Sequence, residues 1–259
     1  MIEKIKFWTP TWGAWIPIQI FGLYAIFFAD APAAWWIYVT IGYLLFAIVG
    51  IAVCYHRYLG HRSFKVTTWM QKFMLWCGIM AGQGSPIFWV LIHRGYHHRL
   101  ADTKDDPHSP RHGFWHAYVG WLFKIKPAMD PKYALDLLQN SDVVFAHKFY
   151  FPILWISNIL IFLISYDLWL WGVIVPAFIT FHAFALNTSA NHYPNLGYRN
   201  YNTTDDSTNV IWLWPILLGD AWHNNHHGSA KNSNFGRRWW EIDPASWIIQ
   251  LLRTDRTIA

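Results

Sequence analysis

Two long stretches of the sequence contain neither lysine nor arginine, and they constrain the fold more than any other feature. They run from residue 7 to 56 and from 149 to 198, 50 residues each, and each carries one acidic residue near its middle, Asp30 or Asp167. The flanking apolar runs can each cross a hydrocarbon core about 30 Å thick, which takes about 20 helical residues. The sequence therefore predicts two helical hairpins, with crossings near residues 12–29, 33–55, 149–165 and 168–187 and tight turns at 29–32 and 165–168.

The positive charges lie outside these crossings, at Lys4 and Lys6, between residues 57 and 148, and from Arg199 onward. Because cytoplasmic loops are enriched in Lys and Arg, both termini and the large middle segment are expected to face the cytoplasm. With 54% hydrophobic and only 14% charged residues, the chain cannot cover a soluble globule with polar surface. We therefore expect an all-α, multi-pass membrane protein of four transmembrane helices, forming one domain over residues 1–259. Residues 56–148 and 188–259 would form a cytoplasmic helical cap, in a bacterial inner membrane or an endoplasmic reticulum-type membrane.

Several smaller features agree with a membrane protein. The first eight residues lack a cleavable signal, so a retained anchor is expected. Cys54 and Cys77 lie in apolar or boundary segments, where a structural disulfide is not expected. Residues 69–92 are apolar but are interrupted by three glycines and Pro86, which favours a re-entrant or interfacial segment over a fifth crossing. The net charge of +5 fits contact with anionic membrane lipid and requires no nucleic acid.

Nine of the fourteen histidines gather on the predicted cytoplasmic side, in three clusters and one isolated position. They are His56 and His61, then His93, His97 and His98, then His192 alone, and finally His223, His226 and His227. Nine imidazoles exceed what one ion can use, because a metal in a protein commonly takes three or four such ligands. The clusters therefore predict a two-metal site, and imidazole ligands leave zinc, copper, iron and nickel open.

Helical geometry, at about 100° per residue, says which rings can meet. Relative to His223, the other two rings of the last cluster lie at about −60° and 40°, so all three share one side of a helix and can converge. His97 and His98 lie about 100° apart and should diverge towards different metals. His56 and His61 would point about 140° apart on a regular helix, so we expect the helix to end or bulge near Gly60.

The remaining polar residues near the clusters are expected to support them. At least one of Asp102, Asp105, Asp106 and Asp220 should orient a ligand ring by hydrogen bonding. The other five histidines, which lack the cluster pattern, should be structural or should contact the ligands: His108, His112, His116, His147 and His182. Only His182 lies within a predicted crossing, which argues against metal transport, because transport favours ligands near the membrane midplane.

The residues around the clusters resemble one known family, the integral-membrane fatty acid desaturases, and specifically their Δ9 acyl-lipid and acyl-CoA (stearoyl-CoA desaturase-like) branch. HRYLGHRSF (residues 56–64) is similar to the first histidine box, HHRLADTKDDPHSPRHGFWHAYVGW (97–121) to the second with its sequel, and DAWHNNHHGSAKNSNFGRRWWEIDPASWIIQLL (220–252) to the third. The resemblance covers about residues 15–252.

The resemblance implies a cytoplasmic cap with two iron ions, which use dioxygen and two electrons to convert a long-chain fatty acyl thioester or lipid into a cis alkene. Carried over residue by residue, it makes all nine clustered histidines metal ligands and adds no further catalytic residue. It also implies an asparagine that reaches one iron through water, for which Asn187 is the candidate. A bent apolar tunnel between the crossings would hold the acyl chain away from water.

Two positions depart from the family pattern. Three residues separate His93 from His97 where the Δ9 branch has two, and Asn187 lies five residues before His192 instead of four. A π-bulge could absorb either insertion. Membrane alkane hydroxylases share the wider spacing, so a di-iron hydroxylase of alkyl, sterol or carotenoid substrates is the alternative function. The chain has no Rossmann glycine fingerprint, CxxC pair or haem segment, so either activity needs an external electron donor, a ferredoxin or a cytochrome b5.

Overall fold

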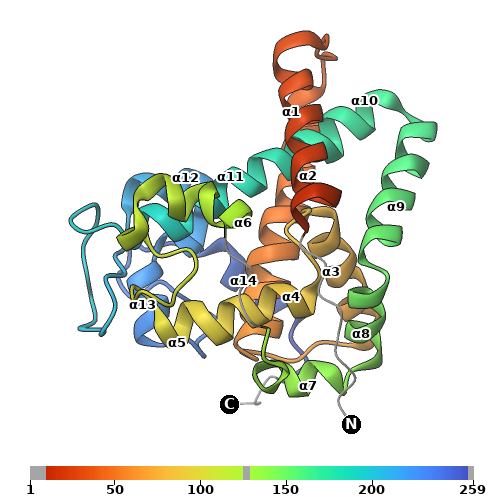
Figure 1. Cartoon of the computed structure of the whole chain (residues 1–259). Helices are drawn as coiled ribbons and strands as arrows, with labels where there is room; N and C mark the ends of the chain where they lie inside the picture. The colour runs from red at the N-terminus through yellow and green to blue at the C-terminus, as the bar shows by residue number, and fades with distance from the viewer. Residues whose placement is uncertain (1–9, 125–128, 256–259) are drawn as a thin grey trace.

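The computed structural model describes residues 10–124 and 129–255, and within these residues every regular element is a helix (Figure 1). The only extended pairing in this part of the chain is a pair of isolated bridges that join Asn209 to Tyr198 and to Trp222. The all-helical prediction is thus confirmed for the described residues. Lys4 and Lys6 lie outside that range.

Three helices of the described chain are long and apolar enough to cross a membrane. The first, Thr11–Phe28, joins η1 (Thr11–Trp15) to α1 (Ile16–Phe28), and the second, Trp35–Gly60, joins α2 (Trp35–Tyr43) to η2 (Leu44–Gly60). The third, Tyr166–Ala190, joins α10 (Tyr166–Trp169), η7 (Leu170–Ile174) and α11 (Val175–Ala190). These helices match three of the four predicted crossings.

The remaining crossing, predicted near residues 149–165, corresponds to a shorter helix. Here α9 (Tyr150–Ile164) has 15 residues, and it follows α8 (Ser141–Lys148) at a bend of 71°. The two helices satisfy the length and composition of a span only when they are taken together. Asn140 begins the pair as an N-cap, because its side-chain oxygen accepts hydrogen bonds from the N–H groups of Asp142 and Val143.

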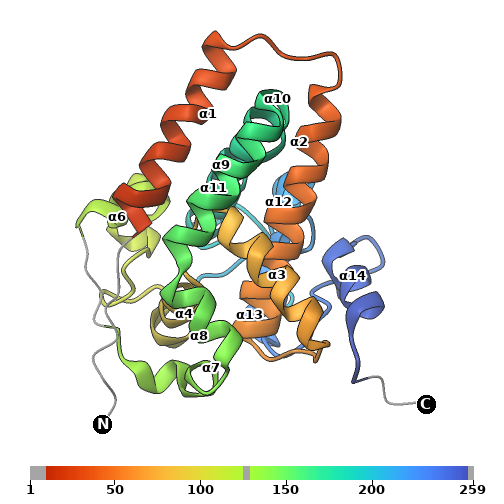
Figure 2. The same cartoon turned by 90° about the vertical axis from the view of Figure 1, so that its right-hand side faces the viewer.

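The two predicted hairpins do not form two separate pairs of packed helices. Figure 2 shows α1 and α2 standing apart, with α10 and α11 between them. Both α1 and α2 pack against η7 and α11, so the first predicted hairpin encloses a helix of the second. Gly42 in α2 permits this approach, because a Cβ at that position would clash with the backbone oxygen of Gly172 in η7.

The apolar segment at residues 69–92 is broken, as its glycines predict. It forms α3 (Thr68–Met80) and α4 (Pro86–Ile92), and the intervening turn contains Gly82 and Gly84 at φ +73° and +107°. Ser85 then caps α4 by accepting a hydrogen bond from the N–H of Phe88. The helix α3 packs closely on η2, where a Cβ at Gly50 would lie 2.6 Å from the backbone carbon of Cys77.

Short helices make up the rest of the described chain. They are η3 (His93–His97), α5 (His98–Leu100), η4 (Pro110–His112), η5 (His116–Gly120), α6 (Trp121–Lys124), η6 (Pro131–Ala134), α7 (Leu135–Leu138), η8 (Ile211–Leu213), α12 (Trp214–Leu217), η9 (Leu218–Ala221), α13 (His223–Gly228) and α14 (Pro244–Leu252). In Figure 1, α5 and α13 lie at the end of the molecule away from the turn between α1 and α2. We refer to this end as the cap.

Candidate metal centre

The nine clustered histidines lie together in two groups, each of which could hold a metal ion. The first group contains His56, His61, His93, His98 and His226, and the second contains His97, His192, His223 and His227. Within each group the ligand atoms lie within 4.8 Å of one another. Segments separated by more than 150 residues in the sequence therefore meet at two adjacent points in the cap.

The end of η2 brings the first two histidines together. This helix has the wide turns of a π-helix and ends at Gly60, so His61 follows it with φ −111°. The two imidazole rings consequently lie 5.1 Å apart, between centroids, instead of on opposite sides of a regular helix. The predicted helix end near Gly60 is confirmed. Gly60 also faces His93, since a Cβ on it would lie 3.2 Å from that ring.

The extra residue of the second cluster is accommodated by a local change of helix type. His93–His97 form one turn of π-helix, and α5 continues from His98. With this turn His93 and His98 both reach the first group, while His97 reaches the second. The predicted divergence of the adjacent His97 and His98 rings is thus what the structure shows.

The three histidines of the last cluster, which could have converged on one ion, divide between the two groups. His223 and His227 of α13 enter the second group, but His226 enters the first. The helical angles explain this split, because His226 lies about 60° to one side of His223 and His227 about 40° to the other. The three rings share one face, as predicted, but they diverge from that face towards two different points.

The Nε2 atoms of each group face one another at distances that suit a shared cation. In the first group His226 Nε2 lies 2.9 Å from His56 Nε2 and 2.9 Å from His98 Nε2. In the second, His223 Nε2 lies 3.0 Å from His192 Nε2 and 3.1 Å from His227 Nε2. One ring nitrogen cannot hydrogen-bond to several other ring nitrogens at once. A metal–nitrogen bond of about 2.1 Å separates two ligands at right angles by about 3.0 Å, so these donors fit an ion between them.

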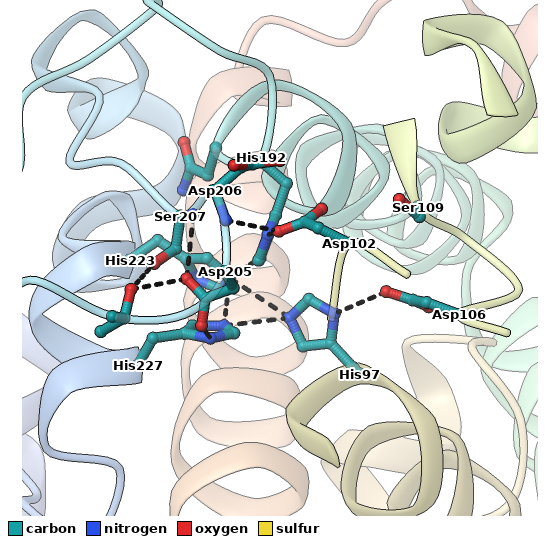
Figure 3. A network of polar contacts seen from close by, with 12 residues as sticks. His97, Asp102, Asp106, Ser109, His192, Asp205, Asp206, Ser207, His223 and His227 are labelled. Atoms are coloured by element: carbon teal, nitrogen blue, oxygen red, sulfur yellow. Dashed lines mark hydrogen bonds and ion pairs between the residues drawn. The ribbon is translucent and has the colours of Figure 1, made fainter. Parts of the chain in front are cut away.

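Buried carboxylates fix the orientation of several rings from behind. Figure 3 shows this arrangement for the second group. His192 Nδ1 donates to Asp102 at 2.8 Å, and His227 Nδ1 donates to Asp205 at 2.8 Å. Each contact places the proton on Nδ1 and leaves the Nε2 lone pair pointing into the group, as is typical of histidine metal ligands. The prediction that an acidic residue orients a ring is confirmed at Asp102.

The other predicted carboxylates differ in their contacts. Asp220 lies 3.3 Å from His56 Nδ1, in the first group. Asp106 lies 3.9 Å from His97 Nδ1 and 3.1 Å from His108 Nδ1, but it forms no hydrogen bond with either ring nitrogen. Asp105 is exposed, and its backbone N–H donates to the hydroxyl of Thr103.

Electrostatics keep most of the nine rings neutral. Burial is the main cause, and the charges of neighbouring imidazoles add to it, so that the pKa of each of six rings falls well below the usual 6.5: His61, His93, His97, His98, His223 and His226. Burial also acts on His192, but the hydrogen bond and charge of Asp102 outweigh it and raise the His192 pKa. A neutral imidazole has a free lone pair, which is the form that binds metal.

The other predicted site residue, Asn187, lies close to the groups but bonds elsewhere. It is buried in α11, and its side-chain oxygen accepts a hydrogen bond of 2.6 Å from Asn191. Among the described residues it has no hydrogen bond to any of the nine histidines. The helix is a regular α-helix here, so no π-bulge absorbs the second departure in spacing. Asn187 does line the cavity described below, as His223 also does.

The five remaining histidines contact neighbouring residues, and His108 also forms a third group of possible metal ligands with His97 and Asp106. His108 packs against His97 with ring centroids 5.0 Å apart, and His147 contacts Ser85. Each of the others hydrogen-bonds to a neighbouring segment: His112 to the carbonyl of Lys104, His116 to the carbonyl of Pro107, and His182 to Tyr118 and Gln19.

Two supporting features are not predicted from the sequence. Asp205 lies in a polar stretch between His192 and the last cluster, and this location is the one signal that could have indicated it. Arg57, which immediately follows a predicted ligand, is fully buried and pairs with Asp220 at 3.1 Å and Asp243 at 3.0 Å. Its guanidinium also lies 3.8 Å from the ring centre of Phe235, which packs on His226. Arg57 thereby ties η2 to the segment after α13.

An apolar cavity adjoins both histidine groups. Its empty volume is about 810 Å³, a figure that includes open solvent at its mouth. His56 and His93 of the first group and His97 and His223 of the second line one part of it. The rest is mainly aromatic and aliphatic, including Trp15, Phe88, Trp121, Leu122, Phe181 and Ala185. A long apolar ligand could therefore lie beside both groups.

Comparison with known proteins identifies the family. The family model described as fatty acid desaturase matches residues 31–254. An sn-1 stearoyl-lipid 9-desaturase of Anabaena variabilis is 36% identical over 233 residues, covering 87% of this chain and 85% of the relative. Delta-9 acyl-lipid desaturase 1 of Arabidopsis thaliana is 36% identical, covering 79% and 68%, and an acyl-CoA 5-desaturase of Anemone leveillei is 34% identical, covering 87% and 70%.

These matches cover all nine clustered histidines and most of the chain, and they agree with the two histidine groups and three apolar helices of the structure. The chain therefore belongs to the fatty acid desaturase family, whose members are membrane-bound, metal-dependent oxidoreductases.

Proposed function

We propose that this protein introduces a cis double bond at the Δ9 position of a long-chain fatty acyl substrate, in a reaction that consumes dioxygen. The observation that carries the proposal is the pair of histidine groups beside one apolar cavity. The names of relatives at 33–36% identity, which include 9-desaturases of acyl lipids, support the position of the double bond.

The metals that we propose are two iron ions, with all nine histidines as ligands. When bound, such a pair supplies the oxidising power needed to remove two hydrogens from an unactivated methylene pair. The protein contributes position and protonation state. Asp102 and Asp205 hold the His192 and His227 protons on Nδ1, and burial lowers the pKa of six further rings: His61, His93, His97, His98, His223 and His226. Asn187, which lines the same cavity as His223, would reach an ion through a water molecule.

The cavity accounts for substrate positioning. Its wall combines η1, α4, η5, α6 and α11, so that an acyl chain entering it would be enclosed by aromatic side chains and brought beside both groups. Exclusion of water matters because the oxidant must act on carbon and not on solvent. The acyl head group is a thioester or a lipid, since relatives of both kinds are similar to this chain.

The proposal extends to topology and to the electron donor. We infer that residues 1–259 form one domain with both termini and the cap in the cytoplasm, because the cations flank the spans on that side. Electrons would come from a separate one-electron carrier, a ferredoxin or a cytochrome b5. The alternative of hydroxylation rested on the wider spacing of His93 and His97, and the π-turn at these residues accommodates that spacing without moving either ring out of its group.

Expression in cells with an added electron-transfer system, followed by mass spectrometry of total lipids, tests the proposal. A new monounsaturated acyl chain with its cis double bond at carbon 9 is expected. A hydroxylated product, which gains an oxygen atom instead of losing two hydrogens, would contradict desaturation. A matched His227→Ala variant, which should form no product, shows that the second group is required.

A further inference from the structure

A band of large apolar side chains is exposed on the segments that flank the histidine helix α13. One part belongs to η8 and α12, before α13, and the other belongs to residue 242 and α14, after it. The exposed fractions of these side chains range from 39% to 79%. We call this set the cap-edge band, and it consists of Ile211, Trp212, Ile216, Ile242, Trp247 and Leu251.

The two parts of the band are joined to each other. The indole N–H groups of Trp214 and Trp222 both donate to the carbonyl oxygen of Ile242, at 2.8 and 2.9 Å. Residues 209–219 and 244–252 contain no charged residue. The nearest acidic residues, Asp220 and Asp243, are buried against Arg57, so they add no charge to the exposed surface of the band. Soluble surfaces seldom leave a joined apolar band of this kind without a partner.

The band lies alongside the candidate membrane spans and not beyond their ends. The hydroxyl of Tyr43 donates a hydrogen bond to the carbonyl oxygen of Ile216. Tyr43 belongs to the span Trp35–Gly60 and precedes its last residue by 17 positions, which is about 20 Å or more along the helix. The helix α12 also packs on α11 of the third span, and α14 packs on η2 of the second.

The band is therefore continuous with the side surface of two spans. A bilayer that surrounds those spans extends to the depth of Tyr43. The hydrogen bond from the Tyr43 hydroxyl to the carbonyl oxygen of Ile216 holds α12 at the same depth. Residues Ile211–Ala221 also form a short apolar helix that is too short to cross. Tryptophan is enriched at membrane interfaces, and each part of the band exposes one tryptophan, Trp212 at 55% and Trp247 at 60%.

We propose that the cap-edge band is a lipid-contact surface, and that η8, α12 and the outer face of α14 lie in the boundary between the hydrocarbon and the headgroups. The helix that carries His223, His226 and His227 is then held between two membrane-embedded segments. This arrangement fixes the depth of the histidine groups relative to the bilayer, where acyl chains reside. The inference concerns membrane contact and stands independently of the proposed reaction.

Site-directed nitroxide labelling of the full-length protein in lipid nanodiscs tests the proposal. Cys54 and Cys77 are both 0% exposed, so labels attach to added cysteines. The test positions are Ile211→Cys and Leu251→Cys, at side chains that are 57% and 79% exposed. Ile20→Cys, on the exposed face of the first span, is the lipid reference, and Asn232→Cys, exposed in the loop after α13, is the aqueous reference.

The readout is the ratio of collisions with oxygen, which concentrates in lipid, to collisions with a water-soluble nickel chelate. We expect both test labels to show a ratio several-fold above that of Asn232→Cys and close to that of Ile20→Cys. A ratio at either test position that matches the aqueous reference overturns the proposal. Low collision rates with both reagents, which a covering protein or a second copy of the chain would cause, also overturn it.

Discussion

The carboxylate behind His227 offers the sharpest test of how the second histidine group is built. Asp205 accepts hydrogen bonds from His227 Nδ1 at 2.8 Å, from the Thr203 hydroxyl at 2.8 Å and from the N–H of Ser207 at 3.0 Å. Burial alone would raise its pKa, but these contacts lower it, so the group is ionised at neutral pH. Asp205→Asn removes the charge and one acceptor oxygen while keeping the size of the side chain.

The expected loss follows from the role of such carboxylates in metal sites. Replacing the hydrogen-bond partner of a histidine ligand typically costs 10–100-fold in metal affinity or activity, which is about 1.4–2.8 kcal/mol. We expect Asp205→Asn to lower the protein's affinity for one of two bound iron ions by this factor and to leave its affinity for the other ion unchanged. Iron content after dialysis against graded chelator, measured by mass spectrometry, resolves the two sites, and product formation in cells should fall in parallel.

The adjacent Asp206 is the matched control. Its carboxylate pairs with Arg111 on the surface, at 2.9 Å, and a surface pair of this kind contributes about 0–1 kcal/mol. Asp206→Asn should therefore keep native iron content and activity. The reasoning is refuted if Asp205→Asn retains both irons at native affinity, or if the two variants lose iron equally.

Three further predictions concern the surrounding structure. Arg57→Leu should destabilise the protein by about 3–5 kcal/mol, since it leaves two buried carboxylates unpaired, and thermal unfolding in detergent would detect this; native-like melting would contradict it. Burial acts to raise the pKa of Asp136, but its hydrogen bonds to two arginines lower it from 3.8 to about 2. This depressed pKa stabilises the fold above about pH 4, and the contribution is lost as pH falls towards 2. Asp136→Asn should thus lose about 1 kcal/mol at neutral pH, allowing for solvent screening, and only a small part of that near pH 2, where the native carboxyl is half protonated; an equal loss at both pH values would argue against the ion pairs. Ala185→Phe should fill part of the cavity and lower product formation from long acyl chains while iron content stays native, whereas unchanged turnover would place the acyl chain elsewhere.

Much of the site could be predicted because the sequence pattern reports local geometry directly. Helical phase separates His97 from His98, and the glycine at position 60 marks the end of η2 that lets His61 turn back. The same reasoning could not assign His226 to the first group. Its angle on α13 is correct, but only the approach of the His226 ring to His56 at the end of η2 decides which group that angle reaches.

The parts that escaped prediction depend on contacts between distant segments. Asp205 lies 22 residues before His227 in the sequence, and nothing local indicates that its loop folds back onto that ring. Similarly, the apolar composition of residues 149–165 does not reveal the bend of 71° that precedes α9. Composition measures how much of a helix is apolar, whereas its length and direction are set by what it packs against.

The central claim is that imidazoles from distant segments hold two metal ions side by side in the cap. Its most direct test is the location of iron by anomalous diffraction at the iron absorption edge, from crystals of the iron-loaded protein. The account predicts two separate peaks, one enclosed by the group of His56 and His226 and one by the group of His97 and His223. A single peak, or iron bound away from these rings, would contradict it.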